Sequence, residues 1–229
     1  MCGRFVLTLD YDMLVDILKG RFDIENIASN LDYIPRYNIA PSQQVLSVAS
    51  NGKKDRIGYL RWGFVPSWAK DTKIGYKMIN ARSESVETKP SYKKSFINNR
   101  CVILSNGFYE WKKEENSKKP MFITMKNNKL FCMAGLYSIY YTKDKQKIST
   151  CTILTTTPNT LMSNIHNRMP VILNKDDEKS WLNPNIKDIA YLKSLLKPYP
   201  TSEMEAYEVS SLVNSPNNES PLCTKPESS

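Results

Sequence analysis

The chain has 229 residues, of which 41% are hydrophobic, a length and composition that suit one compact domain with a sizeable core. Its longest apolar runs, such as Cys101–Leu104 and Val171–Leu173, are far shorter than the roughly 20 residues of a membrane-spanning helix. Asp10, Asp12 and Asp16 interrupt the region where a signal peptide would be apolar. We therefore expect a soluble, cytoplasmic protein with no membrane partner.

The formal net charge of +9 is unevenly distributed, because residues 182–229 carry a net charge of −2 and residues 1–181 carry +11. A basic body of this kind attracts polyanions through their phosphates, without reading a base sequence. The same charge is also consistent with a solvated face that only maintains solubility. Charge alone therefore permits a nucleic-acid partner and does not require one.

The five cysteines form no CxxC pair and no short spacing typical of metal ligands, which argues against a disulfide framework and a zinc site. We expect neither a metal nor a cofactor. Cys101, Cys132 and Cys151 lie in apolar, β-rich runs, where a free cysteine usually behaves as a small core residue.

Cys2 would carry the free α-amine of the chain once Met1 is removed, which makes it a 1,2-aminothiol. An α-amine titrates near about pH 7.7–8.0 and a thiol near about 8.5, so both keep a deprotonated fraction at neutral pH. The amine can condense with an aldehyde to a Schiff base, and the thiol can close on the imine carbon to form a thiazolidine ring. The alternative is that Cys2 is only a small residue of a first strand.

Apolar periodicity predicts a first helix over residues 10–19, with Asp10 as its cap. Residues 44–49 and 57–65 are predicted to form a hairpin that turns at Asn51-Gly52. The other predicted elements are strands near 101–111, 120–125, 130–137 and 148–157, and short helices near 158–165 and 187–197. Most turns between strands are too short for a parallel crossover, so a mainly antiparallel sheet is expected.

Two side chains along these elements are candidates for proton transfer. His166 is the only histidine, and it lies between a predicted helix and an apolar strand. Glu110 lies in an otherwise apolar strand, where alternation places it on the face of Phe108 and opposite Tyr109. It is either an edge-facing charge or a partly buried acid with a shifted pKa.

The segment Asn80–Glu84 combines an amide, a guanidinium and a carboxylate, which suits a phosphate and sugar contact or a local surface ion pair. Trp62 and Trp68 lie earlier in the chain, in a loop region beside basic residues. Exposed aromatic side chains next to cations are typical of base stacking on single-stranded nucleic acid. We predict that Trp62 belongs to the core and that Trp68 is the stacking candidate.

Six short motifs together resemble the SRAP family, in order and in approximate spacing, from residue 2 to about residue 214. They are Cys2–Phe5, Arg36–Pro41, Trp62–Pro66, Asn80–Glu84, Gly107–Trp111 and His166–Pro170. The resemblance implies one α+β domain over residues 2–214, with a curved, mainly antiparallel, barrel-like β core and flanking helices. The Ser-, Asn- and Pro-rich residues 215–229 are expected to form a mobile tail.

The resemblance also implies a function, namely DNA repair in which abasic sites in single-stranded DNA are bound covalently through the N-terminal cysteine. By this resemblance Cys2 is the nucleophile after autocatalytic loss of Met1, and Glu110 assists that step and the Schiff base. His166 serves ring opening and proton transfer, and Asn80 positions the reacting end. A monomer is expected.

The DNA-binding positions that the resemblance implies are Arg4, Pro41, Trp68, Arg82, Lys89, Trp111, Thr155 and Arg168. Pro41 and Trp68 match a region that bends or unstacks the strand. A third backbone arginine of the family has no match in this sequence; Lys89 lies near its place, and a lysine there supplies a point charge instead of a planar fork.

Two other functions remain open from the residues alone. In a cysteine peptidase, Cys2 would attack an amide with His166 as its base. In a non-catalytic single-strand-binding module, Cys2 would be structural, and binding would be sensitive to salt with no covalent product.

Overall fold

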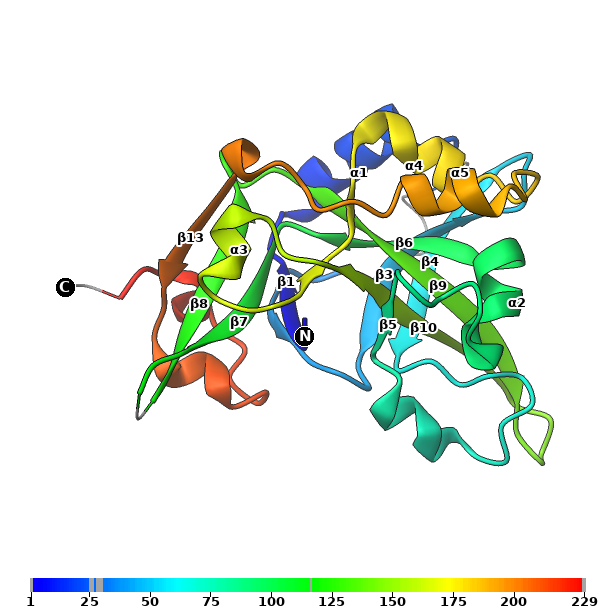
Figure 1. Ribbon diagram of the computed structural model, residues 1–229, viewed down its shortest axis with the longest axis horizontal. Coiled ribbons are helices and arrows are strands. Elements are labelled where there is room, and N and C mark those ends of the chain that lie inside the picture. Colours follow the sequence, from blue (N-terminus) through cyan, green and yellow to red (C-terminus); the bar gives the residue numbers. More distant parts are fainter. Residues whose placement is uncertain (1, 25–26, 28–30, 116, 228–229) are drawn as a thin grey trace.

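The computed structural model describes residues 2–227 except 25–26, 28–30 and 116. Figure 1 shows two β-sheets with helices gathered around them. The strands are β1 (Arg4–Leu7), β2 (Arg36–Ile39), β3 (Gln44–Ser50), β4 (Asp55–Trp62), β5 (Asn80–Arg82), β6 (Arg100–Ser105), β7 (Gly107–Lys113), β8 (Lys118–Met125), β9 (Phe131–Tyr141), β10 (Lys147–Thr156), β11 (Met169–Pro170), β12 (Ile172–Leu173) and β13 (Met204–Glu208). The α-helices are α1 (Tyr11–Arg21), α2 (Pro90–Asn98), α3 (Thr160–Ser163), α4 (Lys175–Leu182) and α5 (Ile189–Ser194).

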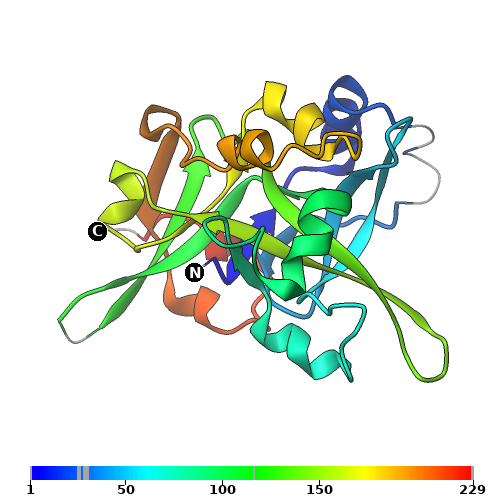
Figure 2. The ribbon, with the colours of Figure 1, turned by 45° about the vertical axis from the view of Figure 1, so that its right-hand side comes forward.

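Five strands of the larger sheet close into a barrel. β3 pairs with β4 and β6, β6 pairs with β9, β9 pairs with β10, and β10 returns to β4. Only the pairings of β10 with β4 and with β5 are parallel among the strand pairs described. Helices α1, α4 and α5 lie together along one side of the sheets, and α2 lies beside β9 (Figures 1 and 2). The predicted α+β fold with a barrel-like, mainly antiparallel core is confirmed.

The second sheet has the strand order β13-β8-β7-β1-β2 and separates two apolar clusters. On β7, Phe108 belongs to the main core, whereas Tyr109 belongs to a smaller cluster on the other face, as alternation along a strand requires. The predicted burial of Trp62 and exposure of Trp68 are also confirmed, since their exposed fractions are 0% and 63%. The predicted core cysteines Cys101, Cys132 and Cys151 are all buried and free.

The strand predicted over residues 101–111 is wrong, because the chain passes from one sheet to the other at Asn106. β6 ends at Ser105 in the barrel, and β7 begins at Gly107 in the second sheet. Asn106 Oδ1 accepts a hydrogen bond from Thr8 N at 2.8 Å, and Asn106 Nδ2 donates to Asn128 Oδ1 at 2.8 Å. The hydrogen bonds of Asn106 therefore hold a change of direction between β6 and β7, within a stretch of sequence whose pattern predicts one strand.

Helix α1 was predicted together with its cap, and Asp10 Oδ1 accepts a hydrogen bond from Met13 N at 2.8 Å. Helices α2 and α4 were not predicted. Among the described residues, no helix is both long enough and apolar enough to cross a membrane.

Arg100, at the start of β6, holds the ends of α2 and α4 to the barrel. Its exposed fraction is 3%. The guanidinium donates to five main-chain carbonyls, at distances of 2.5–3.1 Å, those of Trp181, Phe96, Ile97, Asn183 and Ile186. Burial lowers the pKa of Arg100 to about 10.

The C-terminal strap, residues 213–224, lies against β1 and β2. The Asn38 side chain, which is fully buried, donates to the carbonyls of Val213, Ser215 and Asn218. The Glu219 carboxylate accepts from Arg36 Nε at 2.8 Å and from the main-chain N–H groups of Tyr37 and Asn38. The composition of residues 215–229 predicted a mobile tail, whereas residues 215–227 form contacts with the body because β2 supplies these donors.

We predict that Asn38→Ala lowers the free energy of unfolding by about 2 kcal/mol, since it removes the hydrogen bonds of a buried amide to three strap carbonyls and from Arg4. Chemical denaturation monitored by circular dichroism measures this. Asn217→Ala, at an exposed position of the same strap, is the control and should change stability by less than about 0.5 kcal/mol. Equal effects of the two substitutions would contradict the role given to Asn38.

Candidate active site at the N-terminus

Cys2 lies two residues before β1 and is fully buried. Strand β1 lies between β2 and β7, so its start is fixed from both sides. The Cys2 carbonyl oxygen accepts a hydrogen bond from Asn80 Nδ2 at 2.9 Å. Burial, and then the nearby Glu110 carboxylate, raise the pKa of the Cys2 thiol, which is therefore held protonated at neutral pH.

Glu110 and His166 meet beside Cys2, although they come from distant parts of the chain. Glu110 lies on β7 with an exposed fraction of 3%, and its Oε1 is 4.0 Å from His166 Nδ1. Burial raises the pKa of Glu110. The imidazole follows α3, where His166 N donates to Met162 O at 2.7 Å and Nδ1 accepts from Arg168 N at 3.1 Å. The site thus combines a thiol, a buried acid whose pKa is raised and an imidazole.

Asn80 is fixed by the parallel pairing of β5 with β10, in which it lies opposite Ile153. Its carbonyl accepts a hydrogen bond from the Tyr92 hydroxyl at 3.3 Å, and burial raises the pKa of Tyr92 to about 12. Asn80 Oδ1 is buried and has no hydrogen-bond partner among the described residues. Its Nδ2 already holds Cys2, so the free acceptor can take a donor from a bound molecule.

Arg168 and Thr155, both predicted to contact DNA, contact each other. Arg168 Nη2 donates to the Thr155 carbonyl at 2.5 Å and to its hydroxyl at 3.2 Å, and Thr155 is fully buried. The Arg168 guanidinium also forms a two-pronged pair with Glu84, at 2.5 and 2.9 Å, and this hydrogen bonding lowers the pKa of Glu84. These contacts join the His166 loop to β5 and β10.

Arg4 and Trp111, two further predicted DNA contacts, hold the C-terminal strap. Arg4 Nη1 donates to the Val213 carbonyl at 2.7 Å, and Trp111 Nε1 donates to Asn214 Oδ1 at 2.7 Å. The Arg4 guanidinium also lies over the Trp111 ring, 5.7 Å from its centroid. Both side chains therefore already have partners within the chain.

The remaining predicted positions are at the surface or close to it. Arg82, Lys89 and Trp68 are exposed, and Pro41 is half-buried. Exposed cations and an exposed indole are available to a strand of DNA without rearrangement. Residues that the sequence did not single out are Tyr92 and Asn38, because no local pattern marks a hydroxyl or amide that will support a distant site.

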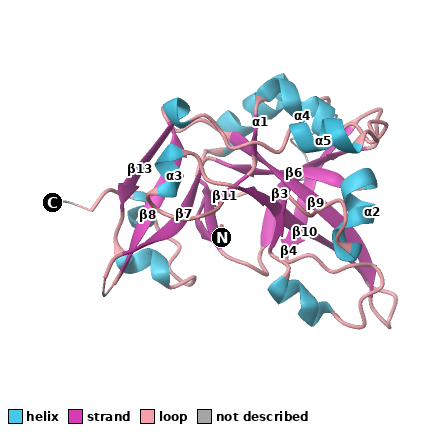
Figure 3. Cartoon of the chain, viewed as in Figure 1, coloured by secondary structure: helices cyan, strands magenta, loops and turns pink. Residues whose placement is uncertain are grey.

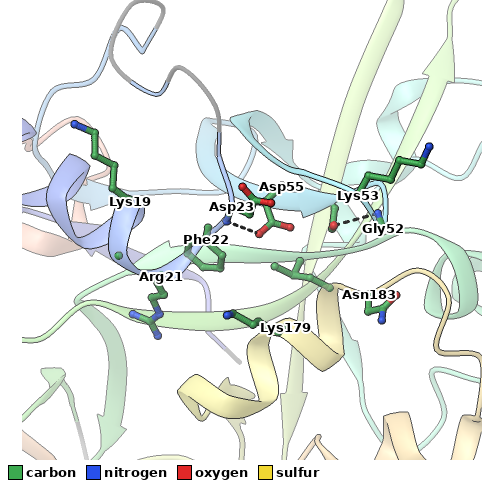
Figure 4. A pocket seen from close by; sticks show the side chains of 12 residues that line it. Lys19, Arg21, Phe22, Asp23, Gly52, Lys53, Asp55, Lys179 and Asn183 are labelled. Carbon is green, nitrogen blue, oxygen red and sulfur yellow. Dashed lines mark hydrogen bonds between the residues drawn. The ribbon is translucent and has the colours of Figure 1, made fainter.

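A cavity of about 510 Å³ lies apart from these residues, between the ends of α1 and α4 and the β3–β4 turn (Figure 4). Its lining includes Lys19, Lys53, Lys179, Asp23 and Asp55. None of the candidate catalytic or DNA-binding residues lines it. In the described part of the chain, no group of three or more His, Cys, Asp or Glu side chains is arranged to hold a metal ion.

The raised pKa of Glu110 predicts a pH-dependent effect of Glu110→Gln on stability. Burial disfavours the charged carboxylate, so its destabilising effect is absent below the ordinary carboxyl pKa of about 4.3 and develops as the pH rises through the raised value. We expect the two proteins to have similar melting temperatures near about pH 4. At neutral pH, the glutamine variant should have the higher melting temperature. Thermal denaturation over this pH range tests the prediction, with each N-terminus verified by intact mass. A difference in melting temperature that does not change with pH would contradict it.

A buried cysteine two residues before the first strand lies near an acid and an imidazole in a barrel-like α+β domain, and these are groups that can serve nucleophilic and acid–base chemistry. Residues 1–216 match the family model of the SOS response associated peptidase (SRAP), so the chain belongs to the SRAP family.

Relatives of this chain carry names that refer to abasic sites. This chain is 50% identical over 222 residues to the abasic site processing protein YoqW of Bacillus subtilis (strain 168), and the aligned region covers 96% of this chain and 97% of that protein. It is 31% identical over 226 residues to the abasic site processing protein HMCES of Gallus gallus, covering 85% of this chain and 67% of that protein. A crystal structure of a Bacteroides thetaiotaomicron protein has a TM-score of 0.85 and 27% identity, covering 99% of this chain and all of that one.

Proposed function

We propose that this protein captures abasic sites in single-stranded DNA by forming a covalent thiazolidine cross-link through Cys2 after it has removed its own Met1. The observation that carries the proposal is the convergence of Asn80, Glu110 and His166 on the N-terminal cysteine. Relatives named abasic site processing proteins support the substrate. The protein would act as a cytoplasmic, DNA-associated monomer without a cofactor.

The first step is hydrolysis of the Met1–Cys2 peptide bond. One water molecule is consumed, methionine leaves, and the α-amine of Cys2 is released beside Glu110. A carboxyl group with a raised pKa is suited to accept a proton from the attacking group and return it to the leaving amine near neutral pH.

The second step is capture of the ring-opened sugar. The Cys2 amine attacks the aldehyde carbon, the resulting carbinolamine loses one water, and the thiol adds across the imine to close the five-membered ring. His166 would move the proton that opens the sugar ring, and Glu110 would protonate the departing hydroxyl. Asn80 Oδ1 would accept a hydrogen bond from the sugar while Nδ2 holds the Cys2 carbonyl.

DNA binding is assigned to two groups of residues. Arg82, Lys89, Trp68 and Pro41 would contact the strand directly, since they are exposed or half-exposed. Arg4, Trp111, Thr155 and Arg168 have partners inside the chain, so we assign them a supporting position in the same surface.

Intact mass spectrometry tests the proposal. The purified protein is weighed before and after incubation with a single-stranded oligonucleotide that carries one abasic site. We expect a mass without Met1, then a denaturation-resistant gain equal to the oligonucleotide less one water. Retained Met1 and no adduct would reject the enzyme and leave a non-catalytic binding module, and turnover of an unrelated peptide would favour a peptidase.

A further inference from the structure

A smaller cavity, of about 260 Å³, lies where the turn between β8 and β9 meets α1 and the start of α4. Its apolar lining comes from Ile17 of α1, Leu173 of β12, and Met125, Leu130 and Phe131 on either side of the turn. Sites for drug-sized ligands usually measure about 300–1,000 Å³. This cavity therefore suits one large apolar side chain better than a whole small molecule.

Three lysines surround this apolar lining. Lys126 and Lys129 flank the β8–β9 turn, and Lys175 is the first residue of α4. All three are exposed, and within the described part of the chain none of them forms an ion pair or a side-chain hydrogen bond. A fourth cation of the lining, Arg21, is already paired with a buried carboxylate. Among the described residues Glu203 is the one acidic residue that lines the cavity, so three unpaired positive charges face one negative charge.

The main chain that carries the two turn lysines is held in place. Asn127 and Asn128 adopt the left-handed conformation, with φ angles of 69° and 49°, which asparagine tolerates better than most residues. Asn128 Oδ1 accepts a hydrogen bond from Asn106 Nδ2 at 2.8 Å. On the other side of the turn, Lys126 N donates to the Glu203 carbonyl at 2.9 Å. Because the turn is already ordered, less conformational entropy is lost when an anion binds to its lysines.

The cavity lies apart from the candidate active site. Its lining includes no residue to which a catalytic or DNA-binding role has been assigned above. Figure 1 shows α1 and α4 along the upper side of the molecule, whereas the start of the chain, marked N, lies below them. A short peptide bound at the cavity would therefore leave the approach to Cys2 open.

The lining favours a peptide over a nucleic acid. A DNA backbone would satisfy the lysines, but it has no apolar group to place in the cavity. Phe131 is 3% exposed, so its ring offers no surface on which a base could stack. A peptide with carboxylates next to a large apolar side chain matches both the charge and the apolar lining.

We propose that this cavity is a docking site for an acidic segment of a partner protein. A large apolar side chain of that segment fills the cavity, and carboxylates beside it pair with Lys126, Lys129 and Lys175. The inference goes beyond the proposed function, since it requires neither Cys2 nor DNA. A contact of this kind would bring the protein to a partner while the candidate active site stays free.

Fluorescence anisotropy with two labelled peptides tests the inference. One peptide consists of four aspartates followed by phenylalanine, and the other ends in alanine instead. We expect the phenylalanine peptide to bind about 10-fold more tightly, because its ring fills the cavity. The double change Lys126→Glu and Lys129→Glu should weaken its binding by about 10-fold. Tyr199→Ala, which removes a half-buried ring from the lining, should reduce the advantage of phenylalanine over alanine.

Lys143→Glu with Lys147→Glu is the matched control, because both lysines are exposed, lie outside the cavity and change the net charge by the same amount. It should alter peptide binding by less than about 2-fold, since distant surface charges are screened by salt. Thermal denaturation verifies that each variant is folded. Equal binding of the two peptides, or an equal effect of the two double changes, would overturn the inference. A loss of single-stranded DNA binding confined to the Lys126 and Lys129 variant would also overturn it, because it would assign the surface to DNA. Peptide binding is measured without DNA, so its failure is distinct from failure of the cross-link in the mass measurement.

Discussion

Cys2→Ser is expected to abolish the denaturation-resistant DNA adduct while leaving the fold intact. Serine retains the α-amine once Met1 is removed, so an imine can still form, but its hydroxyl closes on the imine far less readily than a thiol does. The product should therefore be reversible and trapped only by borohydride reduction. Cys2 is fully buried two residues before a paired strand, and serine differs from it by one atom, so the change separates chemistry from packing.

A second variant tests whether the amine and the thiol must belong to the same residue. Insertion of one alanine between Met1 and Cys2 retains the thiol but moves the α-amine to another residue, so the five-membered ring cannot close. We expect no stable adduct from this protein. A stable adduct from either variant, measured by denaturing electrophoresis and intact mass, would show that the aminothiol is not the reacting group.

Arg100→Met is expected to lower the free energy of unfolding by about 4 kcal/mol. The guanidinium is buried and its five hydrogen bonds all go to main-chain carbonyls, so its removal leaves carbonyls at the ends of α2 and α4 without a donor. For a domain of this length the melting temperature should fall by about 8–16 °C. Methionine has a similar length, which limits the part of the loss that arises from a cavity.

Two controls make the Arg100 prediction specific. Arg56→Met, at an exposed position on β4, should change stability by less than about 0.5 kcal/mol. Arg100→Lys retains a charge but lacks the planar fork, so it should be destabilised as well. If lysine restored the stability of the native protein, the charge and not the five-fold hydrogen bonding would be the stabilising feature.

The parts of the fold that could be predicted are those determined by residues close together in the sequence. The cap of α1 at Asp10, the hairpin turn at Gly52 and the alternation along β7 each depend on neighbouring residues. The closure of the barrel through β10 and the change of sheet at Asn106 depend on pairings between distant segments. No period in the sequence encodes those pairings, so they could not be predicted from the residues.

The candidate site shows the same division. Cys2, Glu110 and His166 could be selected because a terminal thiol, a lone acid in an apolar strand and a single histidine are unusual in themselves. That they meet was implied only by the family resemblance. Tyr92 was missed because its hydroxyl contacts the main-chain carbonyl of Asn80, and no sequence pattern indicates such a contact. The partners of Arg4 were missed because they adjoin a segment whose composition predicted a mobile tail.

The C-terminal strap contacts Arg4 near the N-terminus, although the two segments are synthesised at different times. Arg4 is held by carbonyls 209 and 210 residues further along the chain. Translation proceeds at about 5–20 residues per second, so these partners emerge from the ribosome on the order of ten seconds or more after Cys2. The surroundings of Cys2 are therefore incomplete while the chain is nascent, and under the proposed function the capture of an abasic site would have to wait until the strap is in place.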